Sequence, residues 1–141
     1  MFQQLIVAGY LGSDPVLRVT PSGKQVTNLS VATSRSWNDS NGNKVDETTW
    51  FRVSVWNGQA ASCEKYLSKG DPVLVIGRLR PDENGNPRTF VREDGSFGAS
   101  FEVNALNVRF LPKGVDSHGE YVDIPQESKE PALAEEDEIP F

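Results

Sequence analysis

The stretch "TTWFRVSVWNG", residues 48–58, holds two of the three tryptophans in the chain. If it forms a β-strand, successive side chains point to opposite faces. One face carries Phe51, Val53 and Val55, and it looks like part of a core. The opposite face carries Trp50, Arg52, Ser54 and Trp56. A face that water would normally cover therefore presents two indoles and a guanidinium, which a purely structural strand would not need.

The segments on either side of this stretch predict further strands and one helix. Residues 26–37 alternate in polarity, and the loop "NDSNGNK" after them is typical of a hairpin. The apolar residues of 57–69 follow a helical period, and Gly70 marks the expected end of this helix. Further strands are expected in residues 2–12 and 71–82, and residues 88–111 indicate a long hairpin and a last strand.

This order of elements is typical of a small closed barrel with one capping helix, the OB-fold arrangement. We therefore predict an all-β protein. Residues 1–111 would form a five-stranded OB-fold barrel with one short helix and an extended hairpin. A disordered acidic tail would follow in residues 112–141.

The net charge of −6 is unevenly distributed along the chain. Residues 112–141 hold nine acidic and two basic residues, a net −7, so residues 1–111 carry a net +1. Acidity spread evenly would argue against a nucleic-acid partner, but here it belongs to the tail. The tail has no sustained apolar period and is expected to be disordered. It ends in "EEDEIPF", whose apolar tip a merely solubilising segment would not need.

The residues that enzymes and metal sites use are scarce. The chain has one cysteine, Cys63, and one histidine, His118. A disulfide within the chain, a zinc site and a Ser-His-Asp arrangement in the barrel are therefore unsupported. "PSGKQ" only faintly resembles a phosphate-binding loop, because Arg18 and Gln25 stand where that motif needs glycine and a hydroxyl. We predict no enzymatic activity, no metal and no cofactor.

No targeting or membrane signal stands out. The first residues, "MFQQLIVAGYLGSD", contain no basic leader and no small-residue cleavage site. No apolar run approaches the roughly 20 residues that a membrane span needs. We expect a cytoplasmic protein.

Aromatic and basic residues together are the strongest functional signal. The candidate stacking residues are Trp37, Trp50, Trp56 and Phe90. Aromatic rings can stack on the bases of single-stranded nucleic acid, at about 1–3 kcal/mol per base, without reading sequence. Arginines beside them can meet phosphates, which makes affinity fall with salt. The candidate phosphate contacts are Arg18, Arg35, Arg52, Arg78, Arg80 and Arg88.

Two other interpretations of the aromatic strip remain open. Tryptophans are often half-buried in barrel cores or at subunit interfaces. An aromatic strip can also stack on sugar rings, although Arg52 favours phosphate over a sugar hydroxyl. Tyr10, Phe97, Phe101 and Phe110 are expected to pack rather than to stack on bases, and Cys63 is expected to be a small core residue of the helix.

Several motifs resemble bacterial single-stranded DNA-binding proteins of the replication type. They are "VAGYLGSDPVLRVTPSGKQVTNLSVATSRSW", "TTWFRVSVWN", "CEKYLSKGDPVLVIGRLR" and the terminal "DEIPF". The resemblance implies an OB-fold that assembles, usually as a homotetramer, and binds single-stranded DNA during replication, recombination and repair. It also implies association with the nucleoid.

The resemblance also assigns roles to individual residues. The stacking aromatics would be Trp37, Trp50, Trp56 and Phe90, and the phosphate contacts Arg18, Arg52, Lys69 and Arg88. The acidic tip would recruit other genome-maintenance proteins, with Phe141 in an apolar pocket and the acids steering the encounter. The residues of this docking peptide are Glu135, Glu136, Asp137, Glu138, Ile139, Pro140 and Phe141.

Overall fold

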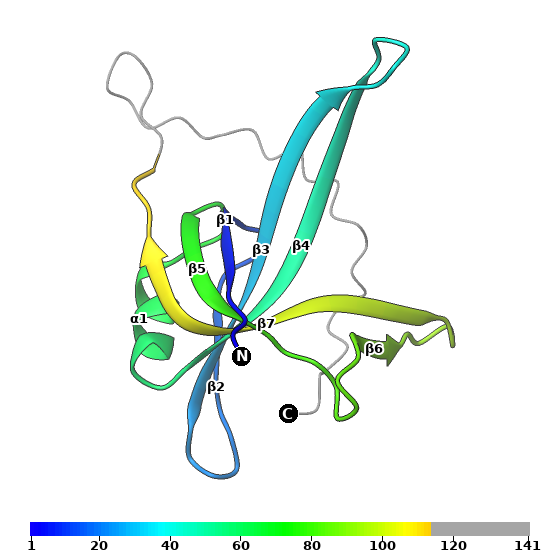
Figure 1. The fold of residues 1–141 in the computed structure, drawn as a ribbon. Helices are drawn as coiled ribbons and strands as arrows, with labels where there is room; N and C mark the ends of the chain where they lie inside the picture. Colours follow the sequence, from blue (N-terminus) through cyan, green and yellow to red (C-terminus); the bar gives the residue numbers. More distant parts are fainter. Residues whose placement is uncertain (114–141) are drawn as a thin grey trace.

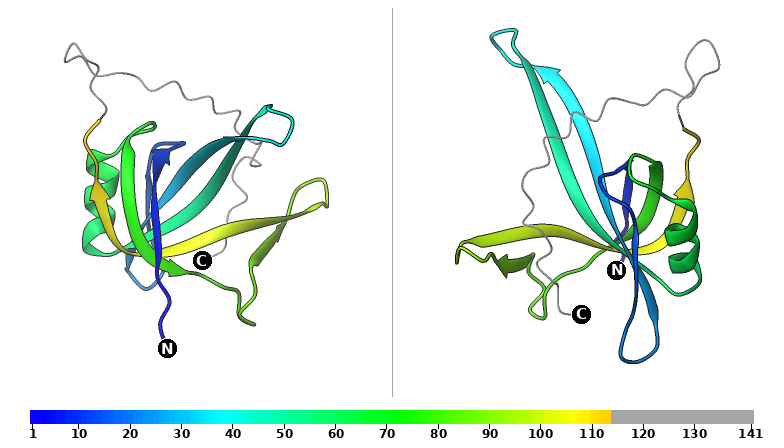
Figure 2. Two further views of the ribbon diagram at one scale, coloured as in Figure 1. Left: turned by 45° about the horizontal axis from the view of Figure 1, so that its top comes forward. Right: turned by 180° about the vertical axis from the view of Figure 1, so that it is seen from behind.

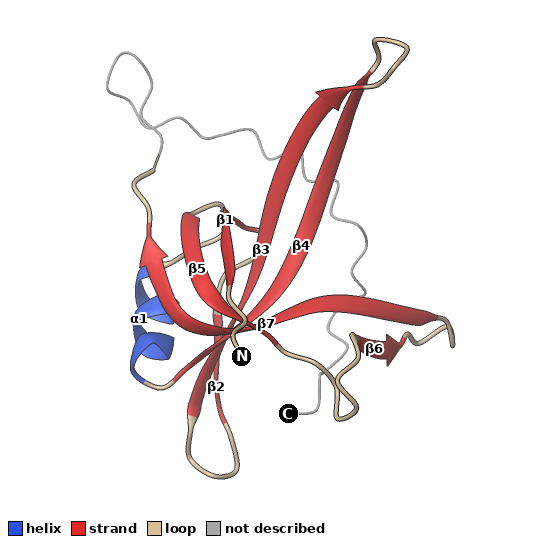
Figure 3. Cartoon of the chain, viewed as in Figure 1, coloured by secondary structure: helices blue, strands red, loops and turns tan. Residues whose placement is uncertain are grey.

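The computed structural model describes residues 1–113, which form seven strands and one helix (Figures 1 and 3). The elements are β1 (Leu5–Leu11), β2 (Val16–Val19), β3 (Gln25–Asn38), β4 (Lys44–Trp56), α1 (Gly58–Tyr66), β5 (Pro72–Leu79), β6 (Arg88–Val91) and β7 (Phe97–Phe110). The predicted all-β class with one short helix is confirmed.

Five of these strands close into a barrel. They pair in the order β1-β5-β7-β4-β3, and β1 also pairs with β3, which joins the two ends of the sheet. All of these pairings are antiparallel except that of β4 with β7. The short strands β2 and β6 lie outside the barrel, paired with β3 and β7. The predicted five-stranded OB-fold barrel is confirmed.

The core lies inside the barrel and is made mainly of valine. Val53 and Val55 of β4 are each 1% exposed and pack with buried residues of β1, β3, β5 and β7. Helix α1 contributes Cys63, which is fully buried as the sequence predicts. β-branched side chains fit this pleated, closed surface well. Phe51, Val53 and Val55 therefore hold the barrel part of β4 to the core.

The β3–β4 and β6–β7 hairpins extend from the barrel as arms (Figures 1 and 2). The β3–β4 arm is long because its register continues from Val26 opposite Trp56 to Asn38 opposite Lys44. The β6–β7 arm points in another direction and is the extended hairpin that the sequence predicts. Because β4 and β7 pair inside the barrel, the two arms start from neighbouring strands.

Two details differ from the expectations drawn from the sequence. Strand β2 is not predicted, and it pairs with a single neighbour at the edge of the sheet. Residues 88–111 were expected to form a hairpin followed by a last strand, but β7 is one strand that serves both purposes. Its register with β5 shifts between Ile76 and Gly77, where β7 has one extra residue. From residue 114 on, the tail that was predicted to be disordered lies outside the described residues.

Candidate nucleic-acid interface

Residues that face each other across neighbouring strands share one face of a sheet. Trp50, Arg52 and Trp56 lie opposite Ala32, Ser30 and Val26 of β3. On the other side of β4, Arg52 and Ser54 lie beside Glu102 and Asn104 of β7. We call this side of the sheet, which is turned away from the barrel interior, the outer face; Val26 lies on it but is fully buried. The predicted alternation of β4 is therefore present in the structure.

Glycines make room for two aromatic rings on or beside the outer face. Trp50 is half-buried, and a Cβ added at Gly12 would lie 2.3 Å from its ring. Phe90 of β6 lies opposite Gly98 of β7, where an added Cβ would be 2.5 Å from the ring. Both distances are far too short for carbon atoms in contact. The two glycines therefore fix where these rings lie.

Arginine side chains flank the ring of Phe90. The guanidinium carbon of Arg52 is 5.2 Å from the ring centre, and that of Arg92 is 5.4 Å away. These distances are within the usual range for cation–π contacts. Phe90 is thus connected to β4 through Arg52, and both belong to one aromatic and basic surface.

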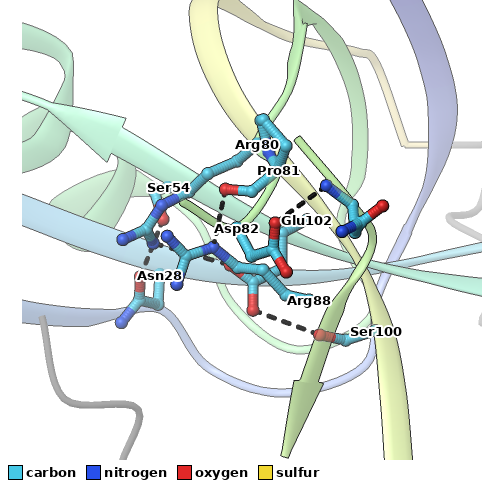
Figure 4. A network of polar contacts seen from close by, with 9 residues as sticks. Asn28, Ser54, Arg80, Pro81, Asp82, Arg88, Ser100 and Glu102 are labelled. Atoms are coloured by element: carbon cyan, nitrogen blue, oxygen red, sulfur yellow. Dashed lines mark hydrogen bonds and ion pairs between the residues drawn. The ribbon is translucent and has the colours of Figure 1, made fainter. Parts of the chain in front are cut away.

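A buried carboxylate holds two further arginines at the outer face (Figure 4). Glu102 is 7% exposed, and its Oε2 atom lies 3.5 Å from both Arg80 Nη1 and Arg88 Nε. Ser100 donates a hydrogen bond to the other carboxylate oxygen at 3.1 Å, and Arg88 also donates to the carbonyl of Pro81 at 3.2 Å. The carboxylate therefore fixes two guanidinium groups side by side.

The pKa of Arg80 reflects its burial and the closeness of Arg88 and Glu102. Burial and the positive charge of Arg88 lower the pKa of Arg80, and the charge of Glu102 opposes this effect. Arginine nevertheless keeps its charge at neutral pH. Two like charges this close would repel each other without the carboxylate between them. Glu102 thus allows the outer face to carry closely spaced cations.

Neutral polar groups and two more arginines complete the outer face. Ser54 is 7% exposed and contacts Asn28 at 3.5 Å (Figure 4). Asn104 has a buried Oδ1 atom without a hydrogen-bond partner in the structure. Arg78 lies opposite Asn104, and Arg18 of β2 lies opposite Val26, which is the neighbour of Trp56.

Three predicted site residues lie elsewhere. Trp37 lies opposite Val45 and therefore shares the core-facing side of β4, although it stands far out on the arm and is 40% exposed. Arg35 lies over the Trp37 ring at 4.6 Å and pairs with Glu47 at 3.1 Å. Lys69 follows α1, and its backbone N–H donates to Asp14. The predicted docking peptide, residues 135–141, lies outside the described residues.

The sequence interpretation missed Glu102, Gly12 and Gly98, all of which shape the outer face. It also expected Phe97 and Phe101 to be packing residues. Phe101 does contact Phe51, with ring centres 5.9 Å apart, but Phe97 and Phe101 are 78% and 60% exposed. Phe97 lies on the β6–β7 arm, which extends beyond the barrel, so one face of the arm has no core to cover it. Phe101 instead pairs with Phe51 of the barrel strand β4.

Other kinds of site find no support in the described residues. Within residues 1–113, no group of three or more His, Cys, Asp or Glu side chains could hold a metal ion. None of the helices in that part of the chain is long and apolar enough to cross a membrane.

The chain matches curated relatives over most of its described part. It is 34% identical over 108 residues to the "Single-stranded DNA-binding protein" of Neisseria meningitidis serogroup A, covering 77% of this chain and 59% of the relative. It is 42% identical over 77 residues to "Single-stranded DNA-binding protein 1" of Chlorobaculum tepidum, covering 55% and 48%. The chain thus spans about half to three-fifths of the length of these relatives.

Solved structures show the same fold. The small single-stranded DNA-binding protein of Streptomyces coelicolor matches with a TM-score of 0.64 and 26% identity, covering 79% of this chain and 96% of that one. A Plasmodium falciparum protein solved in complex with single-stranded DNA matches with a TM-score of 0.62 and 23% identity over 79% of this chain and 96% of that one. Residues 2–111 also match the model of the single-strand binding protein family. The chain belongs to the single-strand binding protein family.

Proposed function

We propose that this chain binds and covers single-stranded DNA without sequence preference, on the outer face of its barrel. The observation that carries the proposal is the row along β4 in which Trp50 and Trp56 flank Arg52 on one face. Any base can stack on an indole, and arginine can pair with any phosphate. The function is binding rather than catalysis, in keeping with the family to which the chain belongs.

The arrangement suggests how a strand would lie. Trp50 and Trp56 are six residues apart on a strand, which places them about 20 Å from each other. The arginines that could meet the intervening phosphates are Arg52, Arg80 and Arg88, with Arg18 and Arg78 at the edges. Phe90 would offer a further ring beside Arg52. We assign DNA binding to residues 1–111.

A titration with oligo-dT tests this function. Tryptophan emission should be quenched as bases stack on Trp50 and Trp56, and the affinity should fall as salt is added. Unchanged emission at low salt would contradict the proposal. Adding an oligosaccharide as a competitor tests the sugar-binding alternative, because displacement of the quench would favour that alternative.

We further propose that the chain acts in DNA replication, recombination and repair, and that its acidic tip recruits partner proteins. The support is the sequence "EEDEIPF", in which four acids precede an apolar end. Such a peptide can be steered by its charge and then fill an apolar pocket. Deleting residues 139–141 should leave oligo-dT affinity unchanged and abolish binding to a partner. Equal partner affinity for the full and shortened chains would refute this part.

We also propose that the chain assembles as a homotetramer and works in the cytoplasm at the nucleoid. The support for assembly is an apolar surface on β1 and β5 that faces away from the core. Ile6 is 61% exposed opposite Ile76, and Tyr10 is 39% exposed opposite Pro72. Exposed apolar surface of this kind marks protein–protein contacts. Light scattering of the unmodified chain should give the mass of four chains, and Ile6→Lys should give a lower mass. A monomer mass for the unmodified chain would rule assembly out.

A further inference from the structure

A cavity of about 520 Å³ opens at one end of the outer face, next to Trp56. Its walls come from the turn between β2 and β3, the end of β4 and the segment after β5. The lining residues are Thr20, Pro21, Ser22, Lys24, Trp56, Asn57 and Arg80. Only Trp56 and Arg80 of these were predicted as site residues, so the cavity adds a part of the surface that has no assigned role.

The turn that forms one wall is held in place by hydrogen bonds. Gly23 has a φ of 84° and donates its backbone N–H to the carbonyl of Thr20 at 2.8 Å. The Thr20 hydroxyl accepts a hydrogen bond from the backbone N–H of Lys24 at 3.1 Å and lies 3.0 Å from the Ser22 hydroxyl. The wall is therefore built before any ligand arrives, which lowers the entropy cost of binding.

The opposite wall contains a residue in a strained conformation. Asn57 directly follows Trp56 and has a φ of 58° and a ψ of −128°, which non-glycine residues rarely adopt. Its backbone is held by bonds to Gln25 and Ala60, and its side chain does not cap α1. Strain of this kind destabilises the folded chain and is concentrated at functional sites. Asn57, which lines the cavity, thus keeps this backbone conformation at some cost to stability.

The chemical character of the lining matches a nucleotide. Lys24 supplies positive charge, the charge of Arg80 is shared with Glu102, and no carboxylate is among the lining residues. Lys24 forms no ion pair with any residue in the described part of the chain. An aromatic ring for the base, a lysine for the phosphate and hydroxyl or amide groups for the sugar and base edges are therefore all present.

We propose that this cavity binds the phosphate next to the base stacked on Trp56, and that Lys24 is the residue that holds this phosphate. The inference rests on the proposed binding of single-stranded DNA and extends the path of the strand. Because Trp56 and Arg80 belong both to the outer face and to the cavity, the strand passes from one to the other without a break. The DNA then leaves the barrel along the β2–β3 turn.

The test compares Lys24→Gln with Lys65→Gln, which removes the same charge from an exposed lysine in the last turn of α1. Both variants are made in the full chain with Trp37→Phe and Trp50→Phe, so that Trp56 is the only tryptophan. With oligo-dT, Lys24→Gln should weaken binding several-fold, reduce the slope of log affinity against log salt by about 0.7 and lessen the quench of Trp56. Lys65→Gln should match its parent in all three.

The outcomes separate this inference from the proposed function. If the unmodified chain fails to bind oligo-dT, the proposed function fails. If it binds and the two lysine variants behave alike, the outer face binds DNA and the cavity does not. Lys24→Glu gives a second measurement and should weaken binding more than Lys24→Gln. Lys24 is exposed, so thermal unfolding midpoints should stay equal for all variants and exclude a folding defect.

Discussion

The two faces of strand β4 differ sharply, although they alternate along the same residues. On the face toward the core, Val53 and Val55 are almost completely buried among other apolar side chains. On the outer face, Trp50 and Arg52 are half-buried and stand among glycines, arginines and a buried acid. One face contributes hydrophobic burial, and the other contributes rings and charges at fixed positions.

Residues of β4 that stabilise the fold can therefore be distinguished one by one from residues that are proposed to bind DNA. A substitution on the core side should change the free energy of unfolding, and one on the outer face should change affinity for DNA. Glu102 is the instructive exception, because it is buried like a core residue yet acts on the charges of the outer face.

Val53→Ala should lower the free energy of unfolding by about 2–3 kcal/mol, because it removes buried methyl groups and leaves a cavity. The affinity of the folded protein for oligo-dT should not change. Urea unfolding followed by tryptophan fluorescence measures the first quantity, and titration well below the midpoint measures the second. A matching loss of affinity would show that the two faces are coupled.

Trp50→Ala should weaken oligo-dT binding by about 2 kcal/mol, or about 30-fold, because one base loses its stacking partner. Gly12→Ala provides a comparison in which the Trp50 ring is still present but is moved, because the new methyl group would occupy its place. We expect a smaller loss of affinity for Gly12→Ala than for Trp50→Ala. Fluorescence anisotropy of labelled oligo-dT measures both, and full affinity for Trp50→Ala would exclude this ring from the interface.

Arg52→Gln should weaken binding less, by about 1 kcal/mol, and lower the slope of log affinity against log salt by about 0.7 for one lost phosphate contact. The control is Lys65→Gln, which lies on α1 and should leave the slope unchanged. Titrations at several salt concentrations measure the slope. If Arg52 only supports the ring of Phe90, affinity will fall while the slope stays the same.

The reactivity of the Cys63 thiol measures how tightly the core side is packed, and the expected effect on it is small. Burial raises the pKa of its thiol to about 11, so the group stays protonated and poorly reactive at pH 8. The pKa of the thiol is raised in the folded state, so the buried, protonated thiol contributes its full share to the free energy of unfolding below pH 9.0, the pKa of the unfolded state. That contribution is lost as the pH rises toward 11. A thiol reagent at pH 8 should label Val53→Ala faster than the parent, and Trp50→Ala no faster. Rapid labelling of the parent would show that the helix is not packed as described.

The alternation of residues 48–58 was enough to predict both faces of β4, because side-chain direction in a strand depends only on sequence parity. The single helix, the barrel and the buried Cys63 were also predictable. Strand β2 was not, since it makes one pairing at a sheet edge and its four residues carry no clear pattern. The position of Trp37 on the other face depends on the register between β3 and β4.

The remaining parts of the outer face depend on contacts between distant residues. Glu102 reaches Arg80 and Arg88 because β7 pairs with β5 on one side and with β6 on its arm. Gly12 and Gly98 gain their roles from rings that pack on them after folding. The cavity beside Trp56 likewise joins a turn, a strand end and the segment after β5. No local pattern in the sequence contains this information.

The parallel pairing of β4 with β7 also has a consequence for the time at which the protein becomes active. Phe51 pairs with Phe101, so fifty residues of chain, including α1 and β5, must be in place before this side of the barrel closes. Contacts between such distant residues form slowly. Arg52 and Glu102 become neighbours only at this step. In a nascent chain on the ribosome, Trp50 and Trp56 would therefore be synthesised well before the outer face is complete. The ability to bind DNA would appear only when the barrel closes.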